Sequence, residues 1–417
     1  MKPGLLAFFY MTVKLLRPSS PTSARLLLLL KGVLGVLVFI MAIDLLTVSM
    51  LQLNNSIANE IFQATLNPYI GLFVGILSTA LLQSSSTVTA MTVAVVASGN
   101  LSLVQAIPLV MGANIGTTLT STLVSFSYIL KKGEFKKALS AGVLHDAFNI
   151  LTVMLLLPLE IHFKVLSSSA QYLTQTFFGA VEGGDTISYP VLFLRPLTLW
   201  IVNGIQLPLL TLLLGVASVF GIIKLLSNLA LKGYVSTNFH KVKRHIFRNP
   251  YLALFYGIFF TALVQSSTIT TSLIVPLVAS RKVSLFKAFP FIMGANIGTT
   301  ITAGIAAFYS TEAAISIAIV HLLFNVIGVL VLLPVPSIRN VPVQMAAYLG
   351  SQSVKTRFVG FAYILLTFFV VPFFLIYFNQ DSSEEQKNAS KLPHSSTSLT
   401  NDSHPGASTD PIRPRSQ

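Results

Sequence analysis

The chain has 417 residues, of which 53% are hydrophobic and only 10% are charged, and its mean hydropathy is +0.76. Soluble domains carry about 25% charged residues, so this composition excludes an ordinary soluble protein. The net charge is +14, but Lys and Arg lie in short loops between apolar runs, which is typical of membrane topology and argues against nucleic acid as a partner. Because the chain has no cysteine, disulfides and cysteine metal sites are excluded.

Long apolar runs predict an all-α polytopic membrane protein embedded in a lipid bilayer. A crossing of about 30 Å of hydrocarbon needs about 20 apolar residues. The runs that meet this length are residues 32–50, 138–157, 209–231, 313–333 and 358–378. Residues 101–130 and 283–310 are two further predicted crossings. The first run contains one acid, Asp44, which is either a functional group or an interfacial or packing residue.

Two polar motifs occur twice inside this apolar sequence. The serine motif is QSSST at residues 83–87 and QSST at residues 265–268. The asparagine motif, GANIGTT, is at residues 112–118 and again at residues 294–300. Aligned without a gap, residues 83–118 and 265–300 are identical at 20 of 36 positions, so the chain is an internal duplication.

Loop charges predict that the two copies have opposite orientations in the membrane. The loop at residues 51–67 has no Lys or Arg, whereas its counterpart at residues 232–249 has five and no acid. Basic loops stay on the inner side, so the copies are predicted to be inverted-topology repeats. The same reasoning predicts that residues 68–98 and 250–280 are re-entrant helical hairpins, and that the asparagine motifs are unwound breaks in the crossings that follow.

The predicted organisation has six parts. They are an N-terminal lead-in (1–25), membrane repeat 1 (26–160), an inter-repeat linker with an interfacial helix (161–207), membrane repeat 2 (208–336), a loop and final transmembrane helix (337–378), and a disordered tail (379–417). Residues 191–207 and 209–231 cannot both cross, because the basic loop after them would then lie outside.

The polar motifs have the chemistry of an ion site. Hairpin tips that meet at the membrane midplane would gather hydroxyl groups around one small oxyanion; these are Ser84, Ser85, Ser86, Ser266, Ser267 and Thr268. The asparagine motifs supply hard oxygen ligands that suit Na⁺ better than a soft metal; these are Asn114, Thr117, Thr118, Asn296, Thr299 and Thr300. Neither motif contains Arg or Lys, so co-bound cations would balance the charge of a multivalent anion.

A different interpretation is that these small and hydroxyl residues only allow close helix packing, as they often do in membranes. Duplication at fixed spacing favours a site. His145 and His321, with Asn149 and Asn325 four residues later, are interpreted as interhelical hydrogen-bonding groups without the other ligands of a metal centre. Asp146 has Leu322 as its counterpart and is left out of a symmetric site.

The paired motifs resemble those of the type II sodium/phosphate cotransporter family, over about residues 30–335. This resemblance implies Na⁺-coupled movement of inorganic phosphate, with Gln83, Gln265, Thr299 and Thr302 among the sodium-site positions. Two departures are Thr268, where the family motif has Ser, and Ala295, where many relatives have Ser. The large outer loop of animal members is missing, so the chain resembles a compact bacterial relative of the inner membrane.

The sequence therefore predicts a secondary active transporter that carries phosphate with Na⁺ by alternating access, and not an enzyme. Na⁺ is the coupling ion, and no cofactor is expected. The alternatives are an exporter of phosphate, a transporter of another small oxyanion, an uncoupled anion channel, or a membrane sensor or scaffold.

Overall fold

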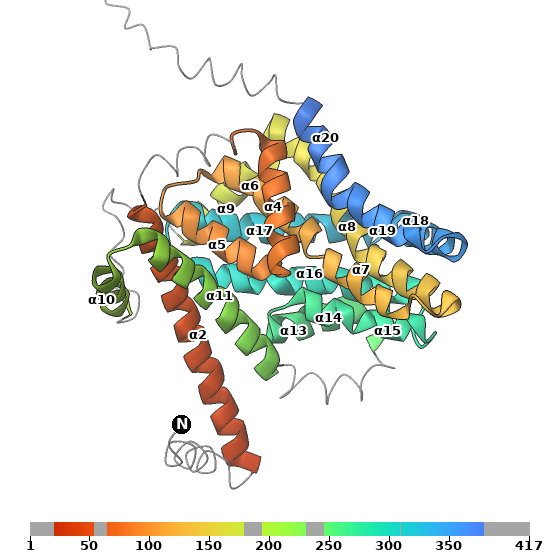
Figure 1. Cartoon of the computed structure of the whole chain (residues 1–417), viewed down its shortest axis with the longest axis horizontal. Helices are drawn as coiled ribbons and strands as arrows, with labels where there is room; N and C mark the ends of the chain where they lie inside the picture. The colour runs from red at the N-terminus through yellow and green to blue at the C-terminus, as the bar shows by residue number, and fades with distance from the viewer. Residues whose placement is uncertain (1–20, 54–64, 179–193, 231–245, 309, 379–417) are drawn as a thin grey trace, which may run out of the picture.

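The structure is a computed structural model that describes residues 21–53, 65–178, 194–230, 246–308 and 310–378, and its regular elements in this part of the chain are helices (Figure 1). Seven stretches of these residues are helices long and apolar enough to cross a membrane. They are α2 (Pro21–Leu51), α6 with α7 (Leu103–Gly116 and Leu119–Ser125), α8 (Lys132–Phe163), α11 (Pro208–Ala230), α16 (Leu285–Ala307), α17 (Glu312–Leu332) and the stretch Phe358–Phe378. The predicted all-α polytopic membrane fold is confirmed.

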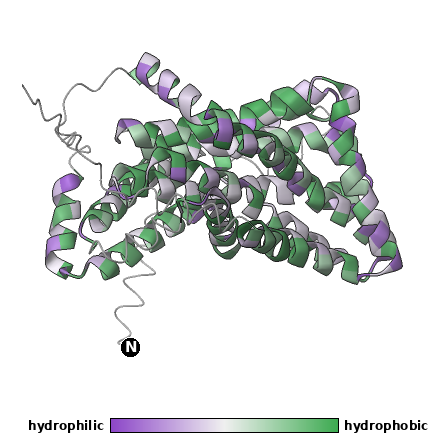
Figure 2. Cartoon of the chain, turned by 90° about the horizontal axis from the view of Figure 1, so that it is seen from above, coloured by the Kyte–Doolittle hydropathy of each residue, from purple (hydrophilic) through white to green (hydrophobic). Residues whose placement is uncertain are grey.

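The surface of the helices suits a bilayer. Figure 2 shows long stretches of helix coloured as hydrophobic, with hydrophilic residues gathered mainly near helix ends. Large apolar side chains such as Leu34, Leu213 and Phe373 are more than half exposed. Lipid tails are the solvent in which such a surface is stable. The predicted lead-in up to residue 20, most of the basic loop at 232–249 and the tail at 379–417 lie outside the described residues.

Each serine motif joins two short helices. In the first repeat α4 (Pro68–Leu82) is followed by α5 (Ser85–Ala97), and in the second α13 (Pro250–Val264) is followed by α14 (Ser267–Ser272) and α15 (Ile274–Ala279). A helix of 15 residues is about 22 Å long, which is too short for a full crossing. Both pairs begin alike, because Asn67 and Asn249 accept a hydrogen bond from the backbone N–H two residues later, at 2.9 and 2.8 Å.

Close contacts at glycines show how these short helices are oriented relative to the long ones. A Cβ atom on Gly75 of α4 would lie 2.0 Å from the backbone oxygen of Leu109 on α6, and one on Gly112 of α6 would lie 2.0 Å from that of Leu72. The contacts advance together along both helices, so α4 and α6 are parallel and adjacent. The chain between them must therefore run back, which is the helical hairpin that the sequence predicted. Its depth in the membrane stays a prediction.

The second repeat packs in the same way. A Cβ atom on Gly257 of α13 would lie 2.2 Å from the backbone oxygen of Phe291 on α16, and one on Gly294 would lie 2.1 Å from that of Leu254. The glycines of the asparagine motif thus allow two helix backbones to touch.

The asparagine motifs were predicted to be unwound breaks, but only the first motif interrupts its helix, and neither motif is unwound. α16 runs through the second motif without interruption. In the first motif only Thr117 and Thr118 separate α6 from α7, and both keep right-handed helical backbone angles. The glycines were expected to loosen the helix, but their lack of a side chain is used for packing instead.

Three further helices lie in segments for which the sequence predicted a linker with an interfacial helix, or a loop. Residues Val165–Phe178 form α9 and Arg195–Ile205 form α10. The predicted loop after residue 337 is instead α18 (Pro336–Lys355), which begins with a proline at its first turn and has too many polar residues to stand out as a membrane segment. The final span consists of α19 (Phe358–Leu365), a π-helical turn η3 (Leu366–Val370) and α20 (Val371–Phe378).

α10 bears on the segment before α11 and on Asp44. It has only 11 residues, so it is too short to cross, and this favours the interfacial alternative for the segment before α11. Its first residue, Arg195, forms an ion pair with Asp44 on α2. The acid in the first spanning helix therefore has a packing role.

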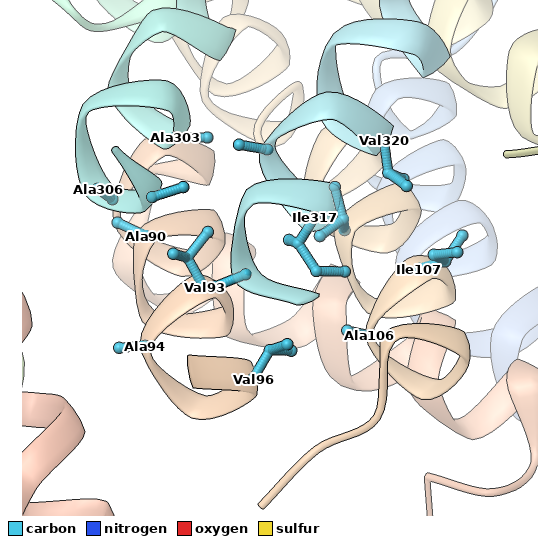
Figure 3. Packing of buried hydrophobic residues seen from close by; sticks show 14 of the residues in the cluster. Ala90, Val93, Ala94, Val96, Ala106, Ile107, Ala303, Ala306, Ile317 and Val320 are labelled. Carbon is cyan, nitrogen blue, oxygen red and sulfur yellow. The ribbon is translucent and has the colours of Figure 1, made fainter. Parts of the chain in front are cut away.

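The two repeats interlock. α8 of the first repeat packs against α18, and α17 of the second packs against α9, so each long helix is covered by the helix that follows the other. In the second of these contacts Thr174 and Ser316 share a hydrogen bond of 2.9 Å. The two repeats share a hydrophobic core. Figure 3 shows part of it, with Ala90, Val93 and Ala94 of α5 beside Ala303 and Ala306 of α16 and Ile317 of α17.

Candidate functional site

The serine motifs form two matching turns. Gln83 and Gln265 have left-handed backbone angles, with φ of 54° and 55°, which residues other than glycine rarely adopt. The next residues, Ser84 and Ser266, are extended and cap the helices that follow, because their hydroxyl oxygens accept from the N–H groups of Thr87 and Ile269. The same left-handed helix ending is therefore present at the equivalent place in both repeats, so the duplication extends to the backbone of the two turns.

The two turns meet. The Ser86 hydroxyl donates to the backbone oxygen of Gln265 over 3.1 Å, which joins the first turn directly to the second. Thr117 and Thr268 share a hydrogen bond of 3.1 Å between their hydroxyl oxygens. Residues predicted for phosphate and for sodium, taken from both repeats, thus lie in one hydroxyl cluster.

A third hydrogen bond extends this contact: the hydroxyl oxygens of Ser121, on α7, and Thr271, on α14, are 3.0 Å apart. Ser85 and Ser267, the first residues of α5 and α14, are buried at 3% and 2% exposure, whereas Ser84, Ser266 and Thr268 are partly exposed. Among the described residues, none of the hydrogen bonds or ion pairs of this cluster involves Lys or Arg.

Several predicted sodium ligands bond within their own helix. The hydroxyl groups of Thr118, Thr299 and Thr300 donate to backbone oxygens three or four residues earlier, at 2.6, 2.9 and 2.7 Å. This arrangement uses the proton and leaves the oxygen lone pairs free to accept or to coordinate. Gln83 is exposed and takes part through its backbone turn.

The second repeat contains buried oxygen atoms that have no partner among the described residues. Three of them are Oε1 of Gln265 and Oγ1 of Thr261 and Thr302. Gly298 on α16 contacts Ile258 and Thr261 on α13, and the two helices are parallel, so Gln265 and Thr302 follow next along the same interface. Buried oxygens without partners are unfavourable unless something binds them.

Two of the residues with unpartnered hydroxyl groups were missed by the sequence analysis. Thr79 and Thr261 each lie four residues before the glutamine of a serine motif, and both have buried, unpartnered hydroxyl oxygens. Their identical spacing was a usable signal. Thr120, the counterpart of Thr302, also has an unpartnered hydroxyl oxygen and was not singled out.

The asparagines of the two motifs bond to histidines across the repeats. His145 on α8 lies 2.6 Å from Oδ1 of Asn296, and His321 on α17 lies 3.2 Å from Oδ1 of Asn114, both measured from the ring Nε2. Because an amide oxygen only accepts, both histidines donate. The interpretation of the histidines as interhelical bonding groups is confirmed, with partners in the opposite repeat.

Asn149 completes this network. Its side-chain Nδ2 donates to the backbone oxygen of Asn114, and its Oδ1 accepts from Nδ2 of Asn296, both at 2.7 Å. The amide oxygens of Asn114 and Asn296, which were predicted for sodium, are therefore engaged by protein groups in this structure.

Asp146 belongs to a different contact. Its Oδ2 accepts from the Thr122 hydroxyl at 3.0 Å and from the Tyr363 hydroxyl of α19 at 2.9 Å. It anchors the final helix, in agreement with its exclusion from the symmetric site.

The chain is similar in sequence to known proteins. The family model described as Na+/Pi-cotransporter matches residues 38–179 and 219–366. "Sodium-dependent phosphate transport protein 2A" from Ovis aries is 31% identical, in an alignment that covers 80% of this chain and 65% of the relative. The corresponding protein 2B from Homo sapiens is 29% identical, with 80% and 62% covered. The chain thus spans slightly less than two thirds of the length of these relatives. No solved structure matches the chain.

The matched ranges include both hairpins, both asparagine motifs and the histidines that connect them, and they make up well over half of the sequence. The chain is a multi-pass membrane protein, and it belongs to the Na+/Pi-cotransporter family.

Proposed function

We propose that this protein is a secondary transporter that carries inorganic phosphate together with Na⁺ by alternating access. The observation that carries the proposal is the contact between the two hairpin turns, in which Ser86 bonds to Gln265 and Thr117 bonds to Thr268. Hydroxyl groups from both repeats converge there, and no Lys or Arg among the described residues bonds to them. Family membership supports the same function, since relatives are named sodium-dependent phosphate transport proteins.

Phosphate binding at this cluster follows from the chemistry of its groups. Hydroxyl groups donate to phosphate oxygens, and the first free backbone N–H groups of α5 add partial positive charge. The predicted phosphate ligands are those of the two serine motifs, with Ser85 and Ser267 as the buried pair. Without a local Lys or Arg, binding of a multivalent anion is weak unless cations bind beside it, so Na⁺ has a direct reason to be coupled.

Sodium binding is supported best in the second repeat. Gln265 and Thr302, both predicted sodium residues, contribute buried oxygens without a protein partner at the interface of α13 and α16. Hard neutral oxygens of this kind suit an alkali cation. Thr261 contributes a third such oxygen on the same helix face, one turn before Gln265.

The interlocked repeats suit alternating access. Each repeat places a short hairpin against the long helices of the other, as α5 does against α16 and α17. A small movement of one hairpin relative to the other would separate the hydroxyl pairs at the turns. This opens the cluster from one side without unfolding either repeat.

Transport assays in vesicles test the proposal. The purified chain is reconstituted, and entry of radiolabelled phosphate is followed with an inward gradient of Na⁺, of K⁺ or of choline. We expect entry only with Na⁺, and inhibition by unlabelled phosphate in excess. Equal entry with all three cations would support an uncoupled channel, and stronger inhibition by sulfate than by phosphate would indicate another oxyanion.

A further inference from the structure

A large apolar cavity lies beside the second asparagine motif. Its volume is about 610 Å³, and its wall is formed by α2, α9, α13, α16 and α17. The lining includes Ile301, Gly304 and Phe308 on α16 and Leu322 on α17. Pockets of this size accommodate a drug-sized ligand or an equivalent length of hydrocarbon.

The internal duplication shows what can cover such a surface. By the alignment of the two repeats, Phe126 corresponds to Phe308 and Leu139 to Ile315, and α19 packs on both Phe126 and Leu139. A Cβ atom on Gly360 of α19 would lie 2.8 Å from the ring of Phe126 and 3.6 Å from the side chain of Leu139. The next residue, Phe361, packs on Phe126 with ring centroids 4.5 Å apart.

The final helix has no second copy in the described residues, so the cavity of the second repeat is not filled by the same means. Figure 1 shows α19 and α20 beside α7 and α8, away from α2 and α11. The corresponding positions of the two repeats thus differ in what covers them: α19 packs on those of the first repeat, and the cavity lies over those of the second.

The two repeats differ in the polar groups at these corresponding positions, and this difference predicts the kind of occupant. In the first repeat Thr122 and Tyr363 donate to Asp146, which holds the helix in place by hydrogen bonds. In the second repeat Gly304 replaces Thr122 and Leu322 replaces Asp146. The wall has lost both polar groups, so it fits an occupant that needs no hydrogen bond.

The cavity opens to the surface that faces the bilayer. Ile301 is 43% exposed, Leu322 40% and Phe308 62%. Ile301 and Leu322 lie on helices that are long and apolar enough to cross a membrane, and Phe308 directly follows the first of these helices. The substance that surrounds such a surface at high concentration is lipid hydrocarbon. We propose that this cavity binds an acyl chain of a bilayer lipid, which takes the place that α19 occupies in the first repeat.

This lipid would contact the second asparagine motif directly. Ile297 and Thr300 belong both to the motif and to the wall of the cavity. A bound acyl chain would therefore contact α16 at the motif and Ile258 of the neighbouring α13. The inference concerns lipid binding and does not depend on which ion the protein transports.

The test is photolabelling with a phosphatidylcholine that carries a diazirine group on its acyl chain. The full chain is reconstituted in vesicles of phosphatidylcholine that contain a small fraction of the probe, illuminated, digested and mapped by mass spectrometry. We expect adducts to concentrate on Ile301, Phe308 and Leu322. Even labelling of all lipid-facing helices would overturn the proposal.

Gly304→Leu supplies the decisive variant, because an added side chain there has no atom within 4 Å and extends into the cavity. Gly221→Leu on α11 is the matched control, since this glycine is also exposed and has open space around it. We expect Gly304→Leu to lose the concentrated labelling and Gly221→Leu to keep it. Equal labelling of both variants would overturn the proposal, and the map of the unaltered chain tests it even if Gly304→Leu does not fold.

A second copy of the chain is the competing occupant. Because the sequence has no cysteine, Ile301→Cys introduces a single thiol at the cavity mouth. If a copy of the same surface docked there, mild oxidation in vesicles would produce a disulfide-linked dimer. We expect monomer, and efficient formation of dimer would overturn the assignment to lipid.

Discussion

His145 of the first repeat donates to Asn296 of the second over 2.6 Å, and His321 of the second repeat donates to Asn114 of the first over 3.2 Å. Each asparagine motif is thus held by a histidine from the opposite repeat. All four side chains are at most 3% exposed. The reciprocal bonds tie the two halves of the candidate site together at the centre of the protein.

Replacing either histidine should destabilise the folded protein. In His145→Leu the Asn296 Oδ1 loses its donor, and an unsatisfied buried polar group costs about 1–3 kcal/mol. We expect a lower midpoint of thermal unfolding in detergent. His162→Leu, on the exposed end of the same helix, is the control and should leave the midpoint unchanged. Equal midpoints for the two variants would show that the crossed bond contributes nothing.

The glycines at the helix contacts should not tolerate a methyl group. In Gly75→Ala or Gly257→Ala the new Cβ atom would lie 2.0 or 2.2 Å from a backbone oxygen, so the helices must separate. Overpacking typically destabilises by about 1–3 kcal/mol. We expect low yields of monodisperse protein on size-exclusion chromatography. Gly221→Ala, with open space around it, should behave like the unaltered chain, and normal behaviour of Gly75→Ala would contradict the parallel packing.

The buried serines should control phosphate affinity. We expect Ser85→Ala and Ser267→Ala to raise the phosphate concentration needed for half-maximal uptake, because each removes a buried hydroxyl donor from a serine motif. Ser98→Ala at the end of α5 is the control, since its hydroxyl bonds to Val95 of its own helix. Uptake kinetics in vesicles provide the measurement. If both variants reach half-maximal uptake at the same phosphate concentration as the unaltered chain, the serine motifs serve helix packing and not phosphate binding.

Replacing Thr302 should weaken sodium binding and leave the stability of the protein without Na⁺ unchanged. Its hydroxyl has no protein partner, so Thr302→Val removes an unsatisfied group and should not destabilise the protein in the absence of Na⁺. A ligand that binds only the folded state raises stability with its concentration. We therefore expect Na⁺ to raise the thermal midpoint of the unaltered chain more than that of the variant.

The control for this experiment is Thr92→Val, because the Thr92 hydroxyl is buried and bonds to Val88 of its own helix. Its response to Na⁺ should match that of the unaltered chain. If Thr302→Val responds fully to Na⁺, then Thr302 does not contribute to a sodium site.

Asp44 and Arg195 should stabilise the contact between α2 and α10 only when both are present. In Arg195→Gln the Asp44 carboxylate, at 6% side-chain exposure, loses its charged partner. The loss for a fully buried pair is about 3–5 kcal/mol, and we expect less here because Arg195 is 38% exposed. The double variant Asp44→Asn with Arg195→Gln should recover part of the loss in thermal midpoint. No recovery would mean that packing, and not charge, joins the helices.

The sequence by itself determined the class, the duplication and the seven crossings. Hydrophobic length is a local property, and a spanning helix must be predominantly apolar over about 20 residues whatever it packs against, so these features can be read without a structure. The two copies of each motif pointed to the residues of both hairpin turns. The close pairing of Ser86 with Gln265 also follows from the predicted meeting of the hairpin tips.

Only the tertiary structure decided the role of the glycines and the partners of the polar groups. Gly112 and Gly294 looked like helix breakers, but whether glycine loosens a helix or allows a neighbour to approach depends on the neighbour, which is distant in sequence. The same holds for His145, whose partner is 151 positions away, and for Asp44, whose charge is paired with Arg195. The apolar cavity likewise depends on the tertiary structure, because its wall is formed by helices that are distant in sequence.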